Sequence, residues 1–424
     1  MLDIHYIEKN CTSVIEKLSS KGLKRADQLI RTLIDKNKER KELQHANDSI
    51  LHQLKKRTKQ VGFSLAKGDV KGAEEDKKWI KNLKVEAKEL AKRLRDVEAD
   101  YQQLLLELPN LPDDSVPMGK DEAHNVVISR WPNQGELPMH IKPHWELLEE
   151  YRLTSFEQGN QIVGAGFPVY HGKGAKLQRA LINFFLEEAI TSGYDEVQVP
   201  LLVNASSAFG TGQIPDKEQT MYGIENTAMY LIPTAEVPVT NIYRGRILEE
   251  KELPIRHVAY TPCFRQEAGS WGSDVRGLNR LHQFDKVELV EIHKVEDGQV
   301  ALEGMLRHVT SLLEKLSLPY RVLQLCRGEL GFASAFTYDV EVWSAGQKKW
   351  LEVSSVSLFK AFQARRMKLF YKDKAGKHLC YTLNGSGLAL PRIMASLLEN
   401  YQEAESICIP EALHPYTQFE KIRV

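Results

Sequence analysis

Two arginines, two glutamates and a phenylalanine gather around one predicted hairpin, and this mixture suits a nucleotide with a small polar ligand beside it. A strand-like run over 257–264 ends at the polar triplet 265–267, a glycine-rich loop follows to Gly277, and a second strand-like run begins at 280. Side chains two residues apart on a strand share a face. The second run therefore predicts one aligned row: Arg280, His282, Phe284, Lys286 and Glu288.

The residue types of the hairpin indicate what it binds. Arginine forks bind phosphate oxygens in pairs, and an aromatic ring offers a stacking face for a base. Arg265 and Arg280 are thus candidate phosphate ligands and Phe284 a candidate stacking ring, while Glu288 can hold an ammonium group. An amphipathic surface hairpin with solvated charges is the alternative for this segment alone.

Two short segments outside the hairpin carry further polar groups. Thr234-Ala235-Glu236 follows an apolar run and offers a hydroxyl and a carboxylate to a small polar substrate, although a helix start capped by Thr234 explains it as well. In the segment 352–355, Glu352 and Ser355 stand three residues apart, which suits a hard cation such as Mg²⁺ shared with phosphates. An ordinary strand end is the alternative there.

The segment 384–387, Asn-Gly-Ser-Gly, precedes an apolar helix with Pro391 in its first turn and Arg392 next. Glycines allow close approach of a ligand, a helix N-terminus favours anions, and Arg392 adds a full charge. A plain turn explains the glycines and the proline but not the arginine. The chain has neither a P-loop nor a strand-linked Gly-x-Gly-x-x-Gly motif, so a nucleotide must be held by side chains on a sheet.

The body that positions these segments is predicted to be α+β. Several β-rich runs follow one another without an intervening helix, which favours an antiparallel sheet flanked by helices. The predicted helices are 175–191 and 297–316, and the predicted strands are 196–203, 228–233, 257–265, 281–292, 338–343 and 350–355.

The first 110 residues predict an antiparallel helical hairpin, a two-stranded coiled coil. Apolar residues alternate at spacings of three and four along both halves, and Gly68 and Gly72 separate the halves. The seam positions are Leu29, Leu33, Leu43, Ile50, Leu54 and Val61 in one half, interrupted by Lys36, Arg40 and Asn47, and Ile80, Leu83, Ala87, Leu90, Leu94, Val97, Tyr101, Leu104 and Leu108 in the other. Prolines 109 and 112 end the second helix, so the predicted organisation is an arm over 1–110, a linker over 111–143 and a body over 144–424.

Charge is distributed unevenly between the arm and the body. Residues 1–110 carry 24 Lys and Arg against 18 Asp and Glu, and the remainder carries 33 against 39, so the two parts are +6 and −6. No acid lies between Asp48 and Asp69. The cations in this stretch predict a contact with a phosphate backbone, for which the alternative is a coiled coil that binds protein. They are Lys55, Lys56, Arg57, Lys59 and Lys67.

Composition narrows the class of protein. The five cysteines are far apart and form no Cys-x-x-Cys pair, which disfavours zinc or redox chemistry. No signal-like segment opens the chain and no stretch approaches 18 consecutive apolar residues, so we expect a cytoplasmic protein with no membrane partner.

Taken together, these segments resemble the three signature motifs of class II aminoacyl-tRNA synthetases, and the seryl branch of bacterial type most closely. Motif one is 193–200, motif two is 261–267 continuing through Glu288, and motif three is 383–392. The triplet 234–236 and the basic helical hairpin are the features of the seryl branch. The resemblance covers nearly the whole chain and implies a class II sheet, a homodimer built through motif one, and a ligase that joins serine to tRNA(Ser) using ATP and Mg²⁺.

The resemblance also implies roles for single residues. Serine would be bound by Thr234, Ala235, Glu236, Arg265, Glu288, Asn384 and Ser386. ATP would be bound by Arg265, Gln266, Glu267, Arg280, Phe284, Glu352, Val353, Ser354, Ser355 and Arg392, with Arg265 and Arg392 catalytic and with Glu352 and Ser355 holding Mg²⁺. The basic residues 55, 56, 57 and 59 would contact tRNA.

The chain departs from the family pattern at several positions, and two other functions stay open. Leu358 stands where the family commonly has asparagine, Lys360 stands near an expected acid, and Trp271 and Ser273 are unusual in the motif-two loop. The alternatives are a synthetase-like paralogue that activates an amino acid for a carrier protein and a catalytically dead RNA-binding scaffold. Whether selenocysteine tRNA is a second substrate also stays open at this point.

Overall fold

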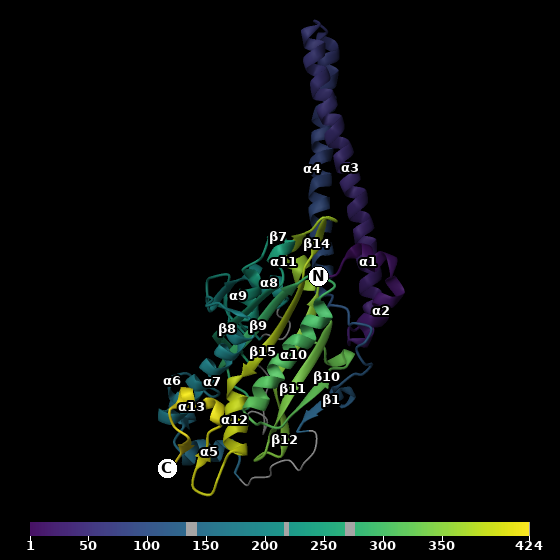
Figure 1. The fold of residues 1–424 in the computed structure, drawn as a ribbon. Coiled ribbons are helices and arrows are strands. Elements are labelled where there is room, and N and C mark those ends of the chain that lie inside the picture. Colours follow the sequence, from purple (N-terminus) through teal and green to yellow (C-terminus); the bar gives the residue numbers. More distant parts are fainter. Residues whose placement is uncertain (133–141, 216–219, 268–275, 424) are drawn as a thin grey trace. The chain divides into compact units, whose positions relative to one another are not determined.

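The computed structural model describes residues 1–132, 142–215, 220–267 and 276–423 (Figure 1). Trp271 and Ser273 lie outside these residues. The chain divides into two compact units. The helical unit comprises residues 2–19 and 23–109, and the body comprises residues 20–22 and 110–424 together with Met1.

The helical unit is built from α1 (Ile4–Lys9), α2 (Cys11–Ser20), α3 (Ala26–Ala66) and α4 (Val70–Glu107). Figure 1 shows α3 and α4 side by side, as the heptad pattern predicts. The turn between them contains Gly68 at a φ of +81°, and Asp69 begins α4 by accepting a hydrogen bond from the Gly72 amide at 3.0 Å.

Apolar seam residues of α3 and α4 are buried against one another. The buried members are Leu33, Leu43, Ile50, Leu83, Leu94, Val97, Tyr101 and Leu105. Leu105 takes the place predicted for Leu104, because 3.6 residues per turn drift away from a 3.5-residue repeat. Two of the polar interruptions find partners on α4: the Lys36 ammonium lies 3.3 Å from Asp100, and the Arg40 guanidinium lies 5.1 Å from the centre of the Tyr101 ring.

The body is built around a large, mostly antiparallel sheet. Among the described residues eight strands join in the order β1-β10-β11-β12-β15-β9-β8-β4, and only β4 is parallel to its neighbour. The strands are β1 (Val126–Trp131), β4 (Asp195–Glu196), β8 (Ile255–Phe264), β9 (Gln283–His293), β10 (Tyr320–Gln324), β11 (Phe336–Ser344), β12 (Lys349–Lys360) and β15 (Tyr381–Ala389). The α+β prediction is confirmed.

Shorter strands form small sheets beside the large one. They are β2 (Thr154–Ser155) with β3 (Val169–Tyr170), β5 (Leu202–Asn204) with β6 (Met229–Leu231), β7 (Ile247–Glu249) with β13 (Phe370–Lys372) and β14 (Lys377–Leu379), and β16 (Ile407–Cys408) with β17 (Lys421–Ile422).

Three helices pack on the large sheet and enclose the main apolar core: α7 (Gly172–Thr191), α10 (Gly298–Lys315) and α12 (Leu390–Asn400). Figure 1 shows α10 crossing in front of the strands. The other helices of the body are α5 (His144–Glu150), α6 (Phe156–Ile162), α8 (Ala205–Thr211), α9 (Glu236–Asn241), α11 (Phe362–Met367) and α13 (His414–Thr417).

Two predicted segments differ from the structure. The stretch 111–143, expected as a linker, contributes β1, which pairs with β10 from Val126↔Gln324 to Trp131↔Tyr320. Its β-branched run of valine and isoleucine favours a strand over a connection. The strand expected over 196–203 is two short strands, β4 and β5, because Pro200 interrupts the pairing between them.

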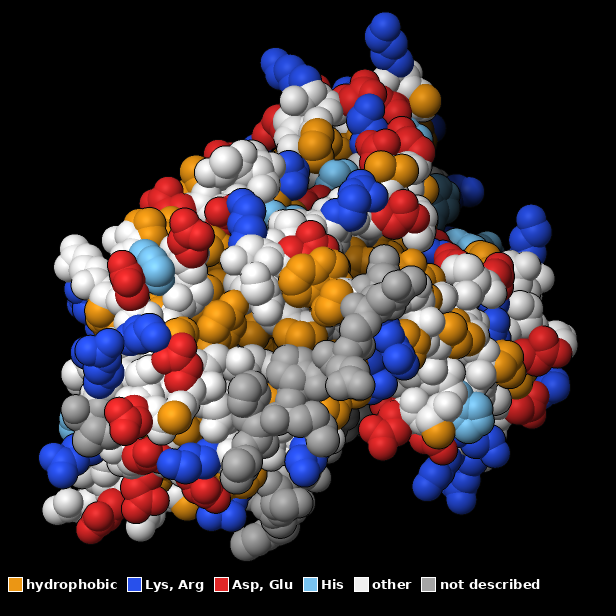
Figure 2. All heavy atoms as spheres, turned by 60° about the horizontal axis from the view of Figure 1, so that its bottom comes forward, with side chains coloured by type: hydrophobic (Ala, Val, Ile, Leu, Met, Phe, Trp, Pro, Cys, Tyr) orange, Lys and Arg blue, Asp and Glu red, His pale blue; other side chains and the backbone are white. Residues whose placement is uncertain are grey.

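The exposed face in Figure 2 mixes basic and acidic side chains, with no large area of a single sign. This mixture agrees with the balanced composition of the chain as a whole. None of the helices in the described residues combines the length and the apolar character that crossing a membrane requires.

Candidate active site

The β8–β9 hairpin places the predicted row of side chains along one face of the sheet. Cys263 pairs with Phe284 and Ala259 with Glu288, so Phe284, Lys286 and Glu288 follow one another on that face. His282 departs from the row, because it precedes β9 and its ring stacks on Phe167 at 5.4 Å. The period-2 prediction therefore holds only where the ladder of strand pairs has begun.

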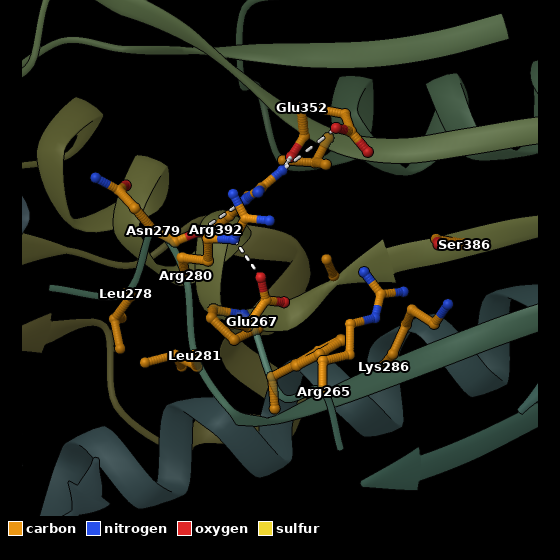
Figure 3. Close-up of a pocket in the computed structure, with 14 residues that line it drawn as sticks. Arg265, Glu267, Leu278, Asn279, Arg280, Leu281, Lys286, Glu352, Ser386 and Arg392 are labelled. Carbon is orange, nitrogen blue, oxygen red and sulfur yellow. Dashed lines mark hydrogen bonds and ion pairs between the residues drawn. The ribbon is translucent and has the colours of Figure 1, made fainter. Parts of the chain in front are cut away.

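A pocket of about 280 Å³, which we call the hairpin pocket, opens over this face. Figure 3 shows Arg265 and Lys286 extending side by side from the hairpin, with Glu352 and Arg392 across the same space. The lining residues are Arg265, Glu267, Leu278, Asn279, Arg280, Leu281, Phe284, Lys286, Glu352, Val353, Ser386, Ala389, Pro391 and Arg392.

Arg265, which directly follows β8, is held by Pro233 and by Phe284 of β9. Its Nε donates to the Pro233 carbonyl at 3.3 Å, and its guanidinium carbon lies 5.2 Å from the centre of the Phe284 ring. Cation–π contact and one hydrogen bond fix the plane of the guanidinium. The fork is therefore oriented into the pocket before any ligand arrives.

Two other arginines border the same pocket. Arg280 forms an ion pair with Glu267, whose backbone has a φ of +49°. Arg392, on α12, donates from Nε to the Asn279 carbonyl at 3.0 Å and from Nη1 to the Glu352 carbonyl at 2.6 Å. Three guanidinium groups thus face one cavity, a charge arrangement that attracts a polyphosphate.

The side chain of Glu288 is fully buried at the inner end of the row. Its Oε2 accepts a hydrogen bond from Thr234 Oγ1 at 3.0 Å, and its Oε1 accepts one from Asn384 Nδ2 at 2.9 Å. Lys286 forms an ion pair with the same carboxylate and donates to Thr234 Oγ1 at 2.9 Å. A buried carboxylate so closely surrounded by polar groups can recognise an ammonium or hydroxyl group.

Thr234 contacts Glu288, and it also lies just before α9, whose N-cap residue is Ala235 and not the predicted Thr234. Its Oγ1 accepts a hydrogen bond from the Glu236 amide at 3.2 Å at the start of α9, while it donates to Glu288. The buried Glu236 carboxylate accepts from Gln363 Nε2 at 2.6 Å. Burial, and then the charge of Glu288, raise the pKa of Glu236 to about 7.

A second, larger pocket of about 750 Å³, the inner pocket, adjoins the hairpin pocket. Thr234, Glu236 and Asn384 line it. The residues that line both pockets are Arg265, Glu267, Arg280, Lys286, Glu352 and Ser386. The groups predicted for a nucleotide and those predicted for a small polar ligand therefore border one continuous hollow.

A β-bulge in β12 brings Glu352 and Ser355 to the same face. Glu352 pairs with Glu341 and Ser354 with Val340, so Val353 is the extra residue. In a regular strand, residues three apart would point to opposite faces. Here Ser355 Oγ donates to Glu352 Oε1 at 3.2 Å and lies 2.6 Å from Asp339 Oδ1.

Asp339, on β11, adds a second carboxylate beside Glu352. Burial and then the charge of Glu352 raise the pKa of Asp339 well above its usual range. No cluster of three or more His, Cys, Asp or Glu side chains that could hold a metal occurs within the described ranges. The oxygen donors here are thus two carboxylates and one hydroxyl.

Asn384 and Ser386 lie in β15 and not in the turn that their glycines suggested. Asn384 pairs with Ser357 and Ser386 with Glu288 across the two neighbouring strands. A Cβ on Gly385 would lie 2.7 Å from the sulfur of Met305. The glycine therefore permits α10 to pack closely against the sheet.

Four predicted active-site residues lie outside both pocket linings: Ala235, Gln266, Glu288 and Ser354. Ala235 is buried in the apolar cluster under α9. Gln266 donates from Nε2 to the Met221 carbonyl at 3.0 Å, and Ser354 Oγ donates to the Ser386 carbonyl at 2.6 Å. These contacts hold neighbouring segments in place.

Three residues at the site received no role from the sequence: Lys286, Asp339 and Gln363. Period-2 spacing from Glu288 was the available signal for Lys286. Asp339 sits opposite Ser355 in the β11–β12 ladder, and Gln363 comes from α11. No local pattern places either of these two beside the site.

The predicted basic residues of the helical unit lie along α3. Lys55, Lys56 and Lys59 are exposed. Arg57 is exposed as well, and it forms an ion pair with Asp76 at 2.5 Å, with its guanidinium 4.6 Å from the centre of the Trp79 ring.

The sheet, the arginine-bearing hairpin and the helix carrying Arg392 together define the core of a class II aminoacyl-tRNA synthetase. The family model described as the tRNA synthetase class II core domain (G, H, P, S and T) matches residues 221–401, and the model of the seryl-tRNA synthetase N-terminal domain matches residues 1–112. The chain belongs to the seryl-tRNA synthetase family.

Full-length relatives support this assignment. The chain is 48% identical to the serine–tRNA ligase of Salinibacter ruber, over all of this chain and 99% of that protein, and 46% identical to that of Akkermansia muciniphila over the same shares. The crystal structure of seryl-tRNA synthetase from Pyrococcus horikoshii complexed with ATP superposes with a TM-score of 0.92 at 30% identity, covering 100% of this chain and 99% of that one.

The two departures from the family pattern in β12 lie away from the pockets. Leu358 belongs to the apolar core on the helix side of the sheet, whereas Ser357, next to it, lines the inner pocket. Lys360 forms an ion pair with Asp113 at 2.5 Å. Leucine at 358 therefore changes core packing and not the pocket wall.

Proposed function

We infer that this chain is a serine–tRNA ligase, which activates L-serine with ATP and transfers it to tRNA(Ser). It is an aminoacyl-tRNA ligase by family, and neither alternative considered above is favoured. The observation that carries the inference is one hollow lined by three arginines and by Thr234 and Asn384, the residues that hydrogen-bond the buried Glu288. A catalytically dead scaffold would not require this cluster of charged side chains, and a ligase that acts on a carrier protein would not require a basic arm.

The proposed serine site is centred on Glu288. Its carboxylate, with Thr234 Oγ1 at 3.0 Å and Asn384 Nδ2 at 2.9 Å, recognises the amino and hydroxyl groups, and Arg265 faces the serine carboxylate. Glu236 and Ser386 complete the wall, while Ala235 packs beneath it. Alanine or glycine would leave this polar cluster partly unmatched, at a cost of about 1 to 3 kcal/mol.

The proposed ATP site is the hairpin pocket. Phe284 stacks on the adenine and Glu267 bonds its edge, while Arg265 contacts the α-phosphate and Arg280 and Arg392 bind the outer phosphates. Val353 lines the pocket, and Gln266 and Ser354 position the strands that bear these groups. Bidentate guanidinium contacts suit phosphate oxygens.

Mg²⁺ fits the oxygen donors of β11 and β12. Glu352 and Ser355 are the proposed ligands, and the raised pKa of Asp339 marks an anionic pair whose repulsion a cation would relieve. When bound, the ion neutralises charge on the phosphates. No other chemistry is required of it.

The reaction then follows from positioning and charge. The serine carboxylate attacks the α-phosphorus in line, pyrophosphate leaves, and Arg265 stabilises the charge that develops on the α-phosphate. The 3′-terminal hydroxyl of tRNA next attacks the acyl carbon of seryl-adenylate and displaces AMP. The first step needs no general base, because the serine carboxylate is already ionised. In the second step the proton of the attacking hydroxyl passes to a phosphate oxygen of the departing AMP.

We propose the sequence-based organisation for the larger parts. Residues 1–110 form the tRNA-binding arm with Lys55, Lys56, Arg57 and Lys59 as phosphate contacts, 111–143 connect the arm to the body and also supply β1, and 144–424 carry catalysis. The exposure of all four cations supports this assignment. Since β4 forms one edge of the large sheet, motif one is free to pair with a second copy, and sedimentation equilibrium tests the resulting homodimer.

Exchange of labelled pyrophosphate into ATP tests the activity directly. We expect exchange that depends on serine and charging of tRNA(Ser) transcripts, with selenocysteine tRNA as a second transcript to be assayed. Exchange with another amino acid and no charging would favour the carrier-protein ligase, and silence with all twenty amino acids would favour the scaffold.

A further inference from the structure

A carboxylate–imidazole pair with no exposed surface lies outside both pockets. Glu399, near the end of α12, accepts a hydrogen bond on Oε1 from the backbone amide of His144 at 2.8 Å, and its Oε1 lies 2.8 Å from His144 Nδ1. Its Oε2 accepts from Ser344 and from the Gly346 amide at 3.1 Å. Such a fully satisfied buried network holds its members in one geometry.

The second nitrogen of His144 reaches the segment that returns from the motif-two loop. Its Nε2 accepts a hydrogen bond from the Leu278 amide at 2.9 Å, which fixes the neutral ring with its proton on Nδ1 toward Glu399. The preceding Gly277 has a φ of +65°, and a Cβ there would lie 2.3 Å from His144 Nε2. Only glycine allows this approach.

Helix α12 makes a second contact with the segment 278–280. Arg392 lies seven residues before Glu399, about two turns away on the same side of the helix, and it donates to the Asn279 carbonyl at 3.0 Å. The Asn279 side chain donates to Gln347 Oε1 at 2.8 Å, and Gln347 Nε2 lies 3.3 Å from Glu399 Oε1. Leu278 and Asn279 are thus both held against α12, and Arg280 is the next residue in the chain.

We propose that His144 and Glu399 are positioning residues for the triphosphate of ATP. By fixing Leu278 against α12, they set the separation between Arg280 and Arg392, the two arginines assigned to the outer phosphates. Neither residue lines a pocket, so they act through the segment 278–280 and touch no substrate. This inference rests on the proposed placement of ATP in the hairpin pocket.

Steady-state pyrophosphate exchange with the full-length enzyme tests the proposal. His144→Phe keeps a ring but removes both hydrogen bonds, and Glu399→Gln removes acceptor capacity. We expect each to raise the KM for ATP about tenfold, equivalent to about 1.4 kcal/mol, with the KM for serine within about twofold. His144→Gln keeps an acceptor for the Leu278 amide and should restore most of the ATP affinity.

Glu291→Gln is the matched control. Glu291 is a similarly buried carboxylate that accepts from His293 Nε2 at 2.6 Å and from the Tyr194 hydroxyl, and it has no contact with the segment 278–280. It should lower the thermal midpoint without a selective change in the KM for ATP. If His144→Phe fails to fold, Glu399→Gln and His144→Gln decide the question.

The proposal is overturned if the KM values for ATP and serine rise together, if neither changes, or if Glu291→Gln gives the same selective effect. Arg392→Ala distinguishes failure of the positioning role from failure of the proposed ATP site. A normal KM for ATP in Arg392→Ala would contradict the proposed phosphate site itself. A raised KM for ATP in Arg392→Ala, with unchanged KM values in the His144 and Glu399 variants, would contradict only the positioning role.

Discussion

Thr234 Oγ1 donates to Glu288 Oε2 across 3.0 Å, while Lys286 Nζ donates to Thr234 Oγ1 across 2.9 Å. The threonine hydroxyl is thus hydrogen-bonded to both a buried cation and a buried carboxylate. The orientation of Glu288 depends on a group 54 residues earlier in the chain. Several of the following predictions depend on this part of the pocket.

Thr234→Ala should lower kcat/KM for serine about ten- to a hundredfold, because Glu288 loses a donor worth about 1 to 3 kcal/mol in a buried site. The KM for ATP should change little. Pyrophosphate exchange with each substrate varied in turn measures both values. Thr234→Ser, which retains the hydroxyl, is the control, and an equal loss in that variant would assign the effect to the missing methyl group.

Arg265→Ala should abolish serine activation even at saturating ATP, with kcat reduced about a thousandfold, because a guanidinium aimed at the α-phosphate is lost. Arg265→Lys retains the charge but not the fork and should remain severely impaired. Single-turnover formation of adenylate measures the chemical step. Near-normal turnover in either variant would refute the assigned role.

The raised pKa of Glu236 should make stability depend on pH. Its folded pKa of about 7 lies above the ordinary value of 4.5. Between these values the folded state binds the proton more tightly, so the stabilisation is complete below about pH 4.5 and is lost as pH rises through 7, by about 3 kcal/mol in total. Urea unfolding from pH 5 to 8 should show this slope in the native protein and not in Glu236→Gln. Identical slopes would contradict the prediction.

Replacing Lys55, Lys56 and Lys59 together by alanine should weaken tRNA(Ser) binding and leave pyrophosphate exchange unchanged, because these lysines contact the tRNA backbone and line neither pocket. The slope of log affinity against log salt should fall by about 3, one for each lost phosphate contact. Filter binding at several salt concentrations measures it. Lys372→Ala, an exposed lysine of β13, is the control, and an unchanged slope in the triple variant would remove the arm cations from the interface.

Much of the fold was predictable where periodicity is strong. The heptads gave α3 and α4, and alternation along β9 placed Phe284, Lys286 and Glu288 on one face. The contact of Ser355 with Asp339 was not predictable, because the register between two strands is set by partners that neither local pattern contains. His144 and Glu399, 255 residues apart, meet for the same reason.

The glycines of β15 illustrate a second reason why the sequence did not predict the structure. Local rules associate Gly385 with a turn, and nothing nearby in the chain indicates that Met305 packs over it. Tertiary packing decides such positions, and it overrides the local preference.

The extra residue Val353 makes this part of the chain sensitive to length as well as to sequence. Deleting it would restore regular alternation and turn either Glu352 or Ser355 toward the helices, exchanging a charge-bearing wall for an apolar one. Evolution can therefore vary the side chain at 353 more freely than it can insert or remove a codon there, and alignments of relatives should be free of gaps between 352 and 355.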